Sequence, residues 1–366
     1  MEETPNSENH KKVGFISRHE RLISSIAFVA GFIWDGLTLT YVNLAEAAII
    51  LGIYVAVIAV GIIVFQAVIS RHESGWKRKV ANVIPYVIQF MFGTLFNASL
   101  IFYTRSAELS TSWPFLLFLT LVIFGNELFR KRQERLTFQI VMFFIAEFLY
   151  FVFTAPIIIG KIGTDIFILS GIASLTVLGI VIFGVYRVAR GRHKEARAVR
   201  VFIIIVVYVA LNYAYFTNLI PPIPLALKDL GVFHSVSKIN DQYVVKYEPA
   251  PPYVFWRKES DIFHQVQGGE VYIWSAVFAP TAFSLPIYHE WYYFNDQNRK
   301  WTLATKTEFR ISGGRAGGYR GFTSKKDILQ GEWRVDITTG NGGRLGRLTF
   351  TVVNATSFLV LETGVR

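Results

Sequence analysis

The spacing of hydrophobic positions changes near residue 227, where long apolar runs give way to alternation. Before that point there are seven apolar runs, at residues 22–42, 47–69, 83–103, 113–129, 138–159, 166–186 and 201–216. Most approach the ~20 residues that a helix needs to cross a bilayer. We therefore predict a membrane α-helical bundle of about seven spans over residues 22–217, preceded by a polar leader at residues 1–21.

In the second part of the chain the apolar period approaches two, as is typical of strands. Trp333, Val335 and Ile337, for example, are expected to face one side, and the polar residues between them the other. Gly- and Asn-rich turns separate seven candidate strands, at residues 243–247, 254–257, 270–278, 287–294, 301–311, 333–338 and 347–352. This pattern predicts an all-β, immunoglobulin-like antiparallel sandwich over residues 243–354.

The segment between the two parts contains Pro221, Pro222 and Pro224. Proline cannot continue a helix and favours extended backbone. We predict a Pro-rich connector over residues 218–242, and a C-terminal tail at residues 355–366.

Lys and Arg gather on one side of the predicted bundle. The leader and the second, fourth and sixth loops hold 18 of them, whereas the opposite loops hold only Arg105 and Lys161. Basic loops stay in the cytoplasm, so the N-terminus is expected there and the β-domain on the other side. Asp35 interrupts the first run, but the β-domain would remain outside even if that run did not span.

Composition agrees with a membrane protein. Hydrophobic residues make up 52% of the 366 and charged residues 17%, which is too apolar for an ordinary soluble protein. The net charge of +11 is explained by the basic loops and by attraction to anionic lipid, so no nucleic-acid partner is expected. Cysteine is absent, which excludes a disulfide framework and Cys-ligated metal.

Polar residues inside the predicted spans are candidate functional groups because each is costly in hydrocarbon. They are Asp35, Asn97, Glu147 and Asn212. One hypothesis is a polar pocket that opens outward, with Glu147 at its floor. The alternative is that these side chains hydrogen-bond between helices, which we favour for the two Asn residues and leave open for Glu147.

Several short motifs in the β-rich part resemble a bacterial domain-of-unknown-function family, number 2914. They are His289-x-Trp291, Gly321-Phe-Thr-Ser-Lys325, Gly331-Glu-Trp-Arg-Val-Asp336, Gly343-Arg-Leu-Gly346 and Phe350-Thr-Val352. The Pro-rich connector and the helical part are similar to the membrane domain that often precedes this family. The resemblance implies a multi-pass protein of the bacterial inner membrane with a periplasmic β-domain, and it implies no reaction.

No catalytic motif is evident in the β-rich part. His289-Glu290 lacks the second His that a zinc protease would need, and residues 313–321 lack the Gly-Lys-Ser/Thr ending of a phosphate loop. We expect no catalysis, cofactor or metal. Aromatic and cationic side chains instead suggest binding of an envelope protein or an anionic glycan. The candidates are Trp291, Arg315, Tyr319, Arg320 and Lys325.

The sequence thus favours a polytopic membrane protein, in contact with the lipid bilayer, whose β-sandwich is a binding or docking module. The alternative function is that of a transporter or channel-like protein that uses Glu147 and Asp35, with the sandwich as an accessory domain. The docking function would require the β-sandwich, whereas the transport function would require Glu147. The sequence predicts no particular oligomeric state.

Overall fold

The computed structural model divides the chain into two compact units, Met1–Ala47 and Ala48–Arg366. The elements below belong to the second unit, apart from the first residues of helix α2. The structure describes residues 44–71, 75–106, 108–128, 136–189, 197–240, 242–254, 257–266, 268–279, 284–312, 318–326, 328–355 and 359–366.

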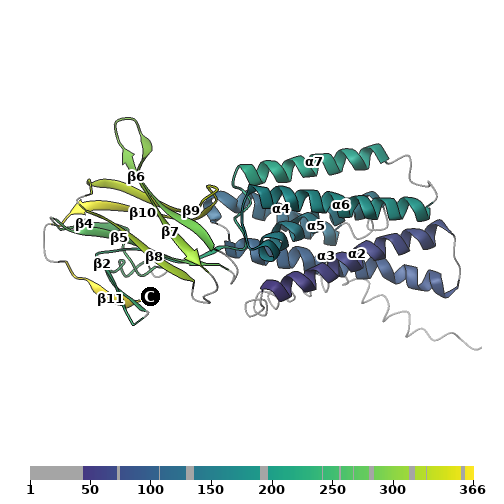
Figure 1. Ribbon diagram of the computed structural model, residues 1–366, viewed down its shortest axis with the longest axis horizontal. Coiled ribbons are helices and arrows are strands. Elements are labelled where there is room, and N and C mark those ends of the chain that lie inside the picture. Colours follow the sequence, from purple (N-terminus) through teal and green to yellow (C-terminus); the bar gives the residue numbers. More distant parts are fainter. Residues whose placement is uncertain are drawn as a thin grey trace, which may run out of the picture. The chain divides into compact units, whose positions relative to one another are not determined.

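Six helices make up the first part of the described chain (Figure 1). They are α2 (Leu44–Ser70), α3 (Trp76–Ser106), α4 (Leu109–Leu128), α5 (Leu136–Ile159), α6 (Thr164–Ala189) and α7 (Arg197–Phe216). Each coincides with a predicted apolar run. Five are long and apolar enough to cross a membrane, whereas the apolar part of α4, Ser110–Gly125, is shorter. The structure therefore describes six helices and not seven, and the first predicted run, residues 22–42, lies outside the described residues.

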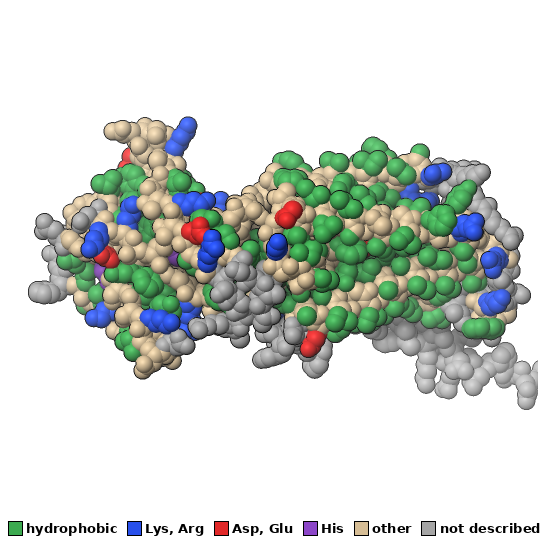
Figure 2. Space-filling model, in the orientation of Figure 1, with side chains coloured by type: hydrophobic (Ala, Val, Ile, Leu, Met, Phe, Trp, Pro, Cys, Tyr) green, Lys and Arg blue, Asp and Glu red, His purple; other side chains and the backbone are tan. Residues whose placement is uncertain are grey.

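Helix α5 is the centre of the helical part. It packs against α3, α6 and α7, and 67% of its most apolar window is buried, compared with 17% for α7. Large apolar side chains on the outer helices therefore remain exposed. Figure 2 shows hydrophobic side chains covering the visible flank of the helices, with Lys and Arg gathered at the helix ends away from the β-domain.

Eleven strands form the described part of the β-domain, in three sheets. The five-stranded sheet has the order β4-β10-β9-β6-β7, and the three-stranded sheets have the orders β1-β5-β8 and β11-β3-β2. The strands are β1 (Ala226–Phe233), β2 (Ser235–Ile239), β3 (Gln242–Tyr247), β4 (Ile262–Gln265), β5 (Glu270–Phe278), β6 (Ser284–Asn295), β7 (Lys300–Ser312), β8 (Tyr319–Lys326), β9 (Gly331–Thr339), β10 (Arg344–Asn354) and β11 (Glu362–Val365). All pairs are antiparallel except β4 with β10.

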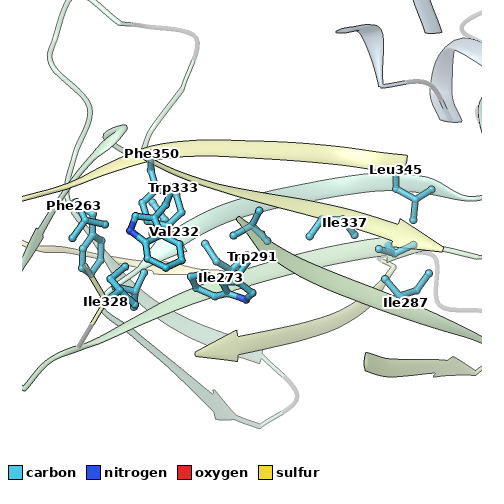
Figure 3. Close-up of a cluster of buried hydrophobic side chains, with 14 of the residues drawn as sticks. Val232, Phe263, Ile273, Ile287, Trp291, Ile328, Trp333, Ile337, Leu345 and Phe350 are labelled. Carbon is cyan, nitrogen blue, oxygen red and sulfur yellow. The ribbon is translucent and has the colours of Figure 1, made fainter. Parts of the chain in front are cut away.

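Two hydrophobic cores hold the three sheets together as layers. The larger core contains Ile273 of β5, Trp291 of β6 and Ile337 of β9, and it lies between the five-stranded sheet and the β1-β5-β8 sheet (Figure 3). On the other face of β5, Trp274 and Ala276 pack against residues of the β11-β3-β2 sheet. The predicted alternation of Trp333, Val335 and Ile337 is confirmed, since all three side chains belong to the larger core.

The β-rich part departs from the prediction in three ways. Five strands lie where none was predicted: β1 and β2 inside the segment predicted as a connector, β11 inside the predicted tail, and β4 and β8 between predicted strands. Neither end of the predicted strand at 254–257 is in a strand. The domain also has a third layer. Strands β1 and β11 lack regular alternation, and they become strands because β5 and β3 offer unpaired edges for them.

Candidate binding face of the β-domain

The five-stranded sheet has one face in the larger core and one face turned outward. On the outward side lie Arg334 and Asp336 of β9, because the alternate residues of that strand point into the core. Their cross-strand partners continue the same face: Tyr292 and Glu290 on β6, and Arg347 on β10. We call this surface the outer face. The residues that form it are Tyr288, Glu290, Tyr292, Phe294, Trp301, Lys306, Arg334, Asp336, Arg344 and Arg347.

One half of the outer face combines aromatic rings with cations. The Arg334 guanidinium carbon lies 4.4 Å from the ring centroid of Tyr292 and 4.8 Å from that of Trp301, so it stacks on two rings. The Lys306 ammonium lies 4.3 Å from the Tyr288 ring. A bulge in β7 opposite Tyr292 turns Trp301 toward this face. Cations and aromatic rings arranged in this way can bind a partner through cation–π contacts and ring stacking.

Glu290 joins these groups by hydrogen bonds. It accepts from the Tyr292 hydroxyl at 2.8 Å and pairs with the Lys306 ammonium at 2.8 Å. Burial alone would raise the pKa of Glu290, but the bonds from Lys306 and Tyr292 hold it below its ordinary value. Burial, together with the bond to the Glu290 carboxylate, raises the pKa of Tyr292 to about 12. At neutral pH the carboxylate is therefore charged and the phenol keeps its proton.

In the other half of the outer face, three guanidinium groups surround Asp336. Arg347 donates two hydrogen bonds to its carboxylate, at 2.7 and 2.8 Å, while Arg334 and Arg344 each approach to 3.5 Å. The Asp336 side chain is only 4% exposed. A two-pronged arginine pair of this kind is among the stronger polar contacts in proteins. Asp336 is thus the hub that fixes the arginines in place.

Arg344 also contacts the start of helix α4. Its Nη1 lies 3.3 Å from Oε2 of Glu108 and 3.0 Å from Oγ1 of Thr111, and the Thr111 hydroxyl donates to Glu108 at 2.7 Å. Burial alone would raise the pKa of Glu108, but bonds from Ser110 and Thr111 and the nearby Arg344 lower it. Near α6, Ile162 packs against the larger core. The α3–α4 and α5–α6 loops therefore both meet the β-domain.

A second polar cluster lies inside the β-domain, around His289. Its Nε2 is 2.8 Å from the Ser275 hydroxyl and its Nδ1 is 2.9 Å from the Thr323 hydroxyl, which also accepts from the Trp291 indole at 3.1 Å. Both Ser275 and His289 are 0% exposed. Burial lowers the pKa of His289 to about 3, so the ring is neutral at neutral pH. Although it pairs a hydroxyl with an imidazole, this cluster is closed to any substrate and satisfies polar groups in the core.

Two further histidines converge on one carboxylate. Glu248 accepts from His234 Nε2 at 2.7 Å and from His264 Nδ1 at 2.6 Å, and the backbone N–H of His264 adds a third bond at 2.7 Å. Burial opposes ionisation of Glu248, but these bonds lower its pKa. The cluster ties β4 to the end of β3. Within the part of the chain that the structure describes, no group of three or more His, Asp or Glu side chains is placed to hold a metal ion.

The structure separates the binding residues that the sequence suggested. Trp291 is 1% exposed and belongs to the core, so it offers no stacking surface. Tyr319 and Lys325 lie on one face of β8 and Arg320 on the other, since they alternate along the strand. Lys325 donates to Thr305 at 2.7 Å, and Arg320 to the backbone oxygen of Arg366 at 3.0 Å. Arg315 lies outside the described residues.

The candidates in the helices are also dispersed. Glu147, in the central helix α5, is 0% exposed, and among the described residues neither of its carboxyl oxygens has a hydrogen-bond partner. Asn97 is buried in α3. Asn212 donates to the Tyr208 backbone oxygen within its own helix, at 2.8 Å. Asp35 lies outside the described residues. A buried hydrogen bond between Gln66 and Gln139, 3.1 Å long, links α2 to α5.

Comparison with known families bears on the β-domain. Residues 285–352 match the model of the family described as "Protein of unknown function (DUF2914)". The β-domain carries the DUF2914 segment. This confirms the resemblance drawn from the sequence motifs. The matched segment contains β7, β8 and β9 and most of β6 and β10, and with them all of the residues named above for the outer face.

Two solved structures that resemble the chain are distant from it. An immunoglobulin-like protein from Pseudomonas aeruginosa shares 10% identity, with 35% of this chain and 96% of that protein covered and a TM-score of 0.21. The alkylpurine DNA glycosylase AlkC of Pseudomonas fluorescens, bound to DNA containing an abasic site analogue, also shares 10% identity, with 85% and 100% covered and a TM-score of 0.21. With TM-scores this low, neither likeness bears on function. No curated protein matches the chain.

The sequence held one signal for the outer face. The alternation at residues 333–338 puts Arg334, Asp336 and Thr338 together on the side away from the core. That pattern could not show that Arg347 and Arg344 join them from β10, or that Tyr292 and Trp301 flank Arg334. These contacts depend on the register of the paired strands.

Proposed function

We propose that this protein is a polytopic protein of the bacterial inner membrane whose periplasmic β-domain is a non-catalytic docking module for an envelope protein or an anionic envelope polymer. The helices provide the membrane anchor, and the N-terminus is cytoplasmic. The docking surface is the β6–β7 half of the outer face, where Tyr288, Phe294 and Trp301 lie beside Lys306 and Arg334.

Two observations support the membrane arrangement. The outer helices expose large apolar side chains along their length, which only lipid or a partner helix would cover. The loops that meet the β-domain, through Glu108 and Ile162, are the two that carry one basic residue each. The heavily basic loops connect the other helix ends. The positive-inside rule therefore agrees with a β-domain outside the cytoplasm.

The observation that carries the docking proposal is the stacking of Arg334 between Tyr292 and Trp301. Aromatic rings and arginine are enriched where proteins bind partners, because they combine large contact area with polar recognition. The Phe294 and Trp301 rings pack edge-to-face at 5.2 Å on the same hairpin. Rings fixed in place by such contacts lose little conformational entropy when a partner binds.

The test is site-specific photo-crosslinking in native membranes. A photoreactive phenylalanine analogue replaces Phe294, and in a matched control it replaces Tyr253, which is 77% exposed in the same domain but lies off the outer face. We expect a defined envelope protein or polymer to be crosslinked from position 294 and not from position 253. The product should disappear when Lys306→Glu reverses the local charge. The same product from both positions would contradict the proposal.

Glu147 favours one alternative function. A fully buried carboxyl group without a hydrogen-bond partner among the described residues is unusual for a simple anchor, since intramembrane acids often mark transport paths. If the protein transports a solute or ions, Glu147→Gln should abolish flux in reconstituted vesicles without reducing crosslinking from position 294. If it is an anchor and docking module, Glu147→Gln should change neither.

A further inference from the structure

Among the residues that the structure describes, the β10 side of the outer face has an excess of positive charge. Arg334, Arg344 and Arg347 supply three guanidinium groups, and the carboxylates paired with them are Asp336 and Glu108. The side chains of Arg344 and Arg347 are each 27% exposed, so part of each guanidinium reaches the surface. Three clustered arginines with spare N–H groups are suited to an anion with several oxygens, such as a phosphate.

The position of Arg344 relative to helix α4 narrows the range of possible anionic ligands. Arg344 contacts Glu108 and Thr111 at the first turn of α4. Two residues later, about 160° around the helix from Thr111, a row of exposed apolar side chains begins and continues along one face of α4. The row consists of Trp113, Leu117, Leu121 and Phe124. From Trp113 to Phe124 the helix rises about 16 Å, which is about half of a ~30 Å hydrocarbon core. A cationic site therefore lies at one end of an apolar track as long as one bilayer leaflet.

We propose that Arg344 and Arg347, supported by Arg334, bind the phosphate headgroup of an anionic phospholipid whose acyl chain lies along the exposed face of α4. This inference rests on the membrane insertion proposed above. Two carboxylates balance two of the three guanidinium charges, and the phosphate of the headgroup supplies negative charge for the third. Asp336 holds Arg347 by two hydrogen bonds, and Glu108 with Thr111 holds Arg344, so the arginines are ordered before the lipid arrives.

The lipid site and the docking surface lie on the same sheet and share Arg334, but their outer residues are far apart. β10 is separated from β7 by β9 and β6, a distance of about 14 Å at the usual strand spacing. Lys306 on β7 belongs to the docking surface, whereas Arg344 on β10 belongs to the lipid site. Each can be changed without touching the other.

The experiment measures thermal unfolding of the purified full-length protein in a neutral detergent as phosphatidylglycerol or phosphatidylcholine is added. We expect phosphatidylglycerol to raise the melting temperature at lower concentrations than phosphatidylcholine does. Arg344→Gln should raise the half-maximal phosphatidylglycerol concentration about tenfold, the size expected for losing one charge-assisted contact. The matched control is Arg310→Gln, because Arg310 is a 79% exposed arginine on the β7 edge strand, and it should behave as wild type.

Three outcomes would overturn the inference. One is an Arg344→Gln protein that keeps the wild-type preference for phosphatidylglycerol. Another is the same stabilisation by millimolar inorganic phosphate alone, which would make the ligand a soluble anion. The third outcome concerns Arg344→Lys, which replaces Arg344→Gln if that variant does not fold. Lysine keeps the charge but not the planar guanidinium group, and an unchanged preference for phosphatidylglycerol in this variant would overturn the inference.

A membrane control separates this inference from the proposed function. Alkaline carbonate extraction of membranes from cells that contain the full-length protein reports whether the chain is embedded in the bilayer. Release of the wild-type chain by carbonate would contradict membrane insertion itself. A chain that resists extraction but shows no preference for phosphatidylglycerol would refute only the lipid site.

Discussion

Removing the Asp336 carboxylate should strongly destabilise the β-domain. The side chain is 4% exposed and accepts two hydrogen bonds from Arg347, at 2.7 and 2.8 Å. A hydrogen bond to a charged group contributes about 1.5–3 kcal/mol, and breaking a buried ion pair from one side costs about 3–5 kcal/mol. Asp336→Ala also leaves three guanidinium groups facing one another. We expect a loss of about 3–5 kcal/mol in the free energy of unfolding.

The assay is thermal unfolding of the full-length protein in detergent, followed by tryptophan fluorescence. Trp291 and Trp333 lie in the larger core, so their emission reports on the β-domain. A loss of this size corresponds to a fall of roughly 6–20 °C in melting temperature. The matched control is Glu308→Ala, which removes a 40% exposed carboxylate paired with an exposed arginine and should cost about 0–1 kcal/mol. If the two variants melt within 2 °C of each other, roughly the resolution of the argument, Asp336 is not the hub described above.

Two further changes probe the core of the β-domain. Because burial lowers the pKa of His289 to about 3, the unfolded chain binds this proton more readily below pH 6.5, and stability falls as the pH falls from 6.5 toward 3. Between pH 6.5 and 5 the free energy of unfolding of the wild type should fall by about 2 kcal/mol through this group. Denaturant unfolding at the two pH values measures this loss, and an equal loss in His289→Gln would refute the assignment. Phe350→Ala, at a site 1% exposed, should cost about 3–5 kcal/mol in the same unfolding assay. Leu303→Ala, at a site 49% exposed, should cost under about 1 kcal/mol, and equal losses at the two positions would show that Phe350 is not a core residue.

Much of the secondary structure follows from local pattern. Each described helix coincides with an apolar run, and runs of this length and composition are typical of helices. Strand β5, at Glu270–Phe278, agrees with the prediction to the residue. Apart from β2, which pairs with the next strand β3, the strands that the sequence did not predict pair with distant segments of the chain. β11, for example, is ordered by pairing with β3, more than 100 residues earlier.

The candidate site shows the same limit more sharply. Aromatic residues and arginines are visible in the sequence, but the sequence does not distinguish core from surface. The sequence therefore suggests Trp291 as a binding residue although it lies in the core, and it does not point to Trp301, which flanks Arg334. The β-bulge opposite Tyr292 decides which way Trp301 points, and a bulge has no reliable sequence signature here.

What the sequence determined by itself is the class of protein: apolar helices with asymmetric basic loops, followed by a β-domain with the DUF2914 segment. These properties depend on composition and short-range periodicity, which each segment carries alone. Only the tertiary structure decided that Arg344 meets Glu108, 236 positions away, and that three arginines share Asp336. Strand register and packing determine these contacts. Both depend on interactions throughout the fold, so the sequence of one segment does not specify them.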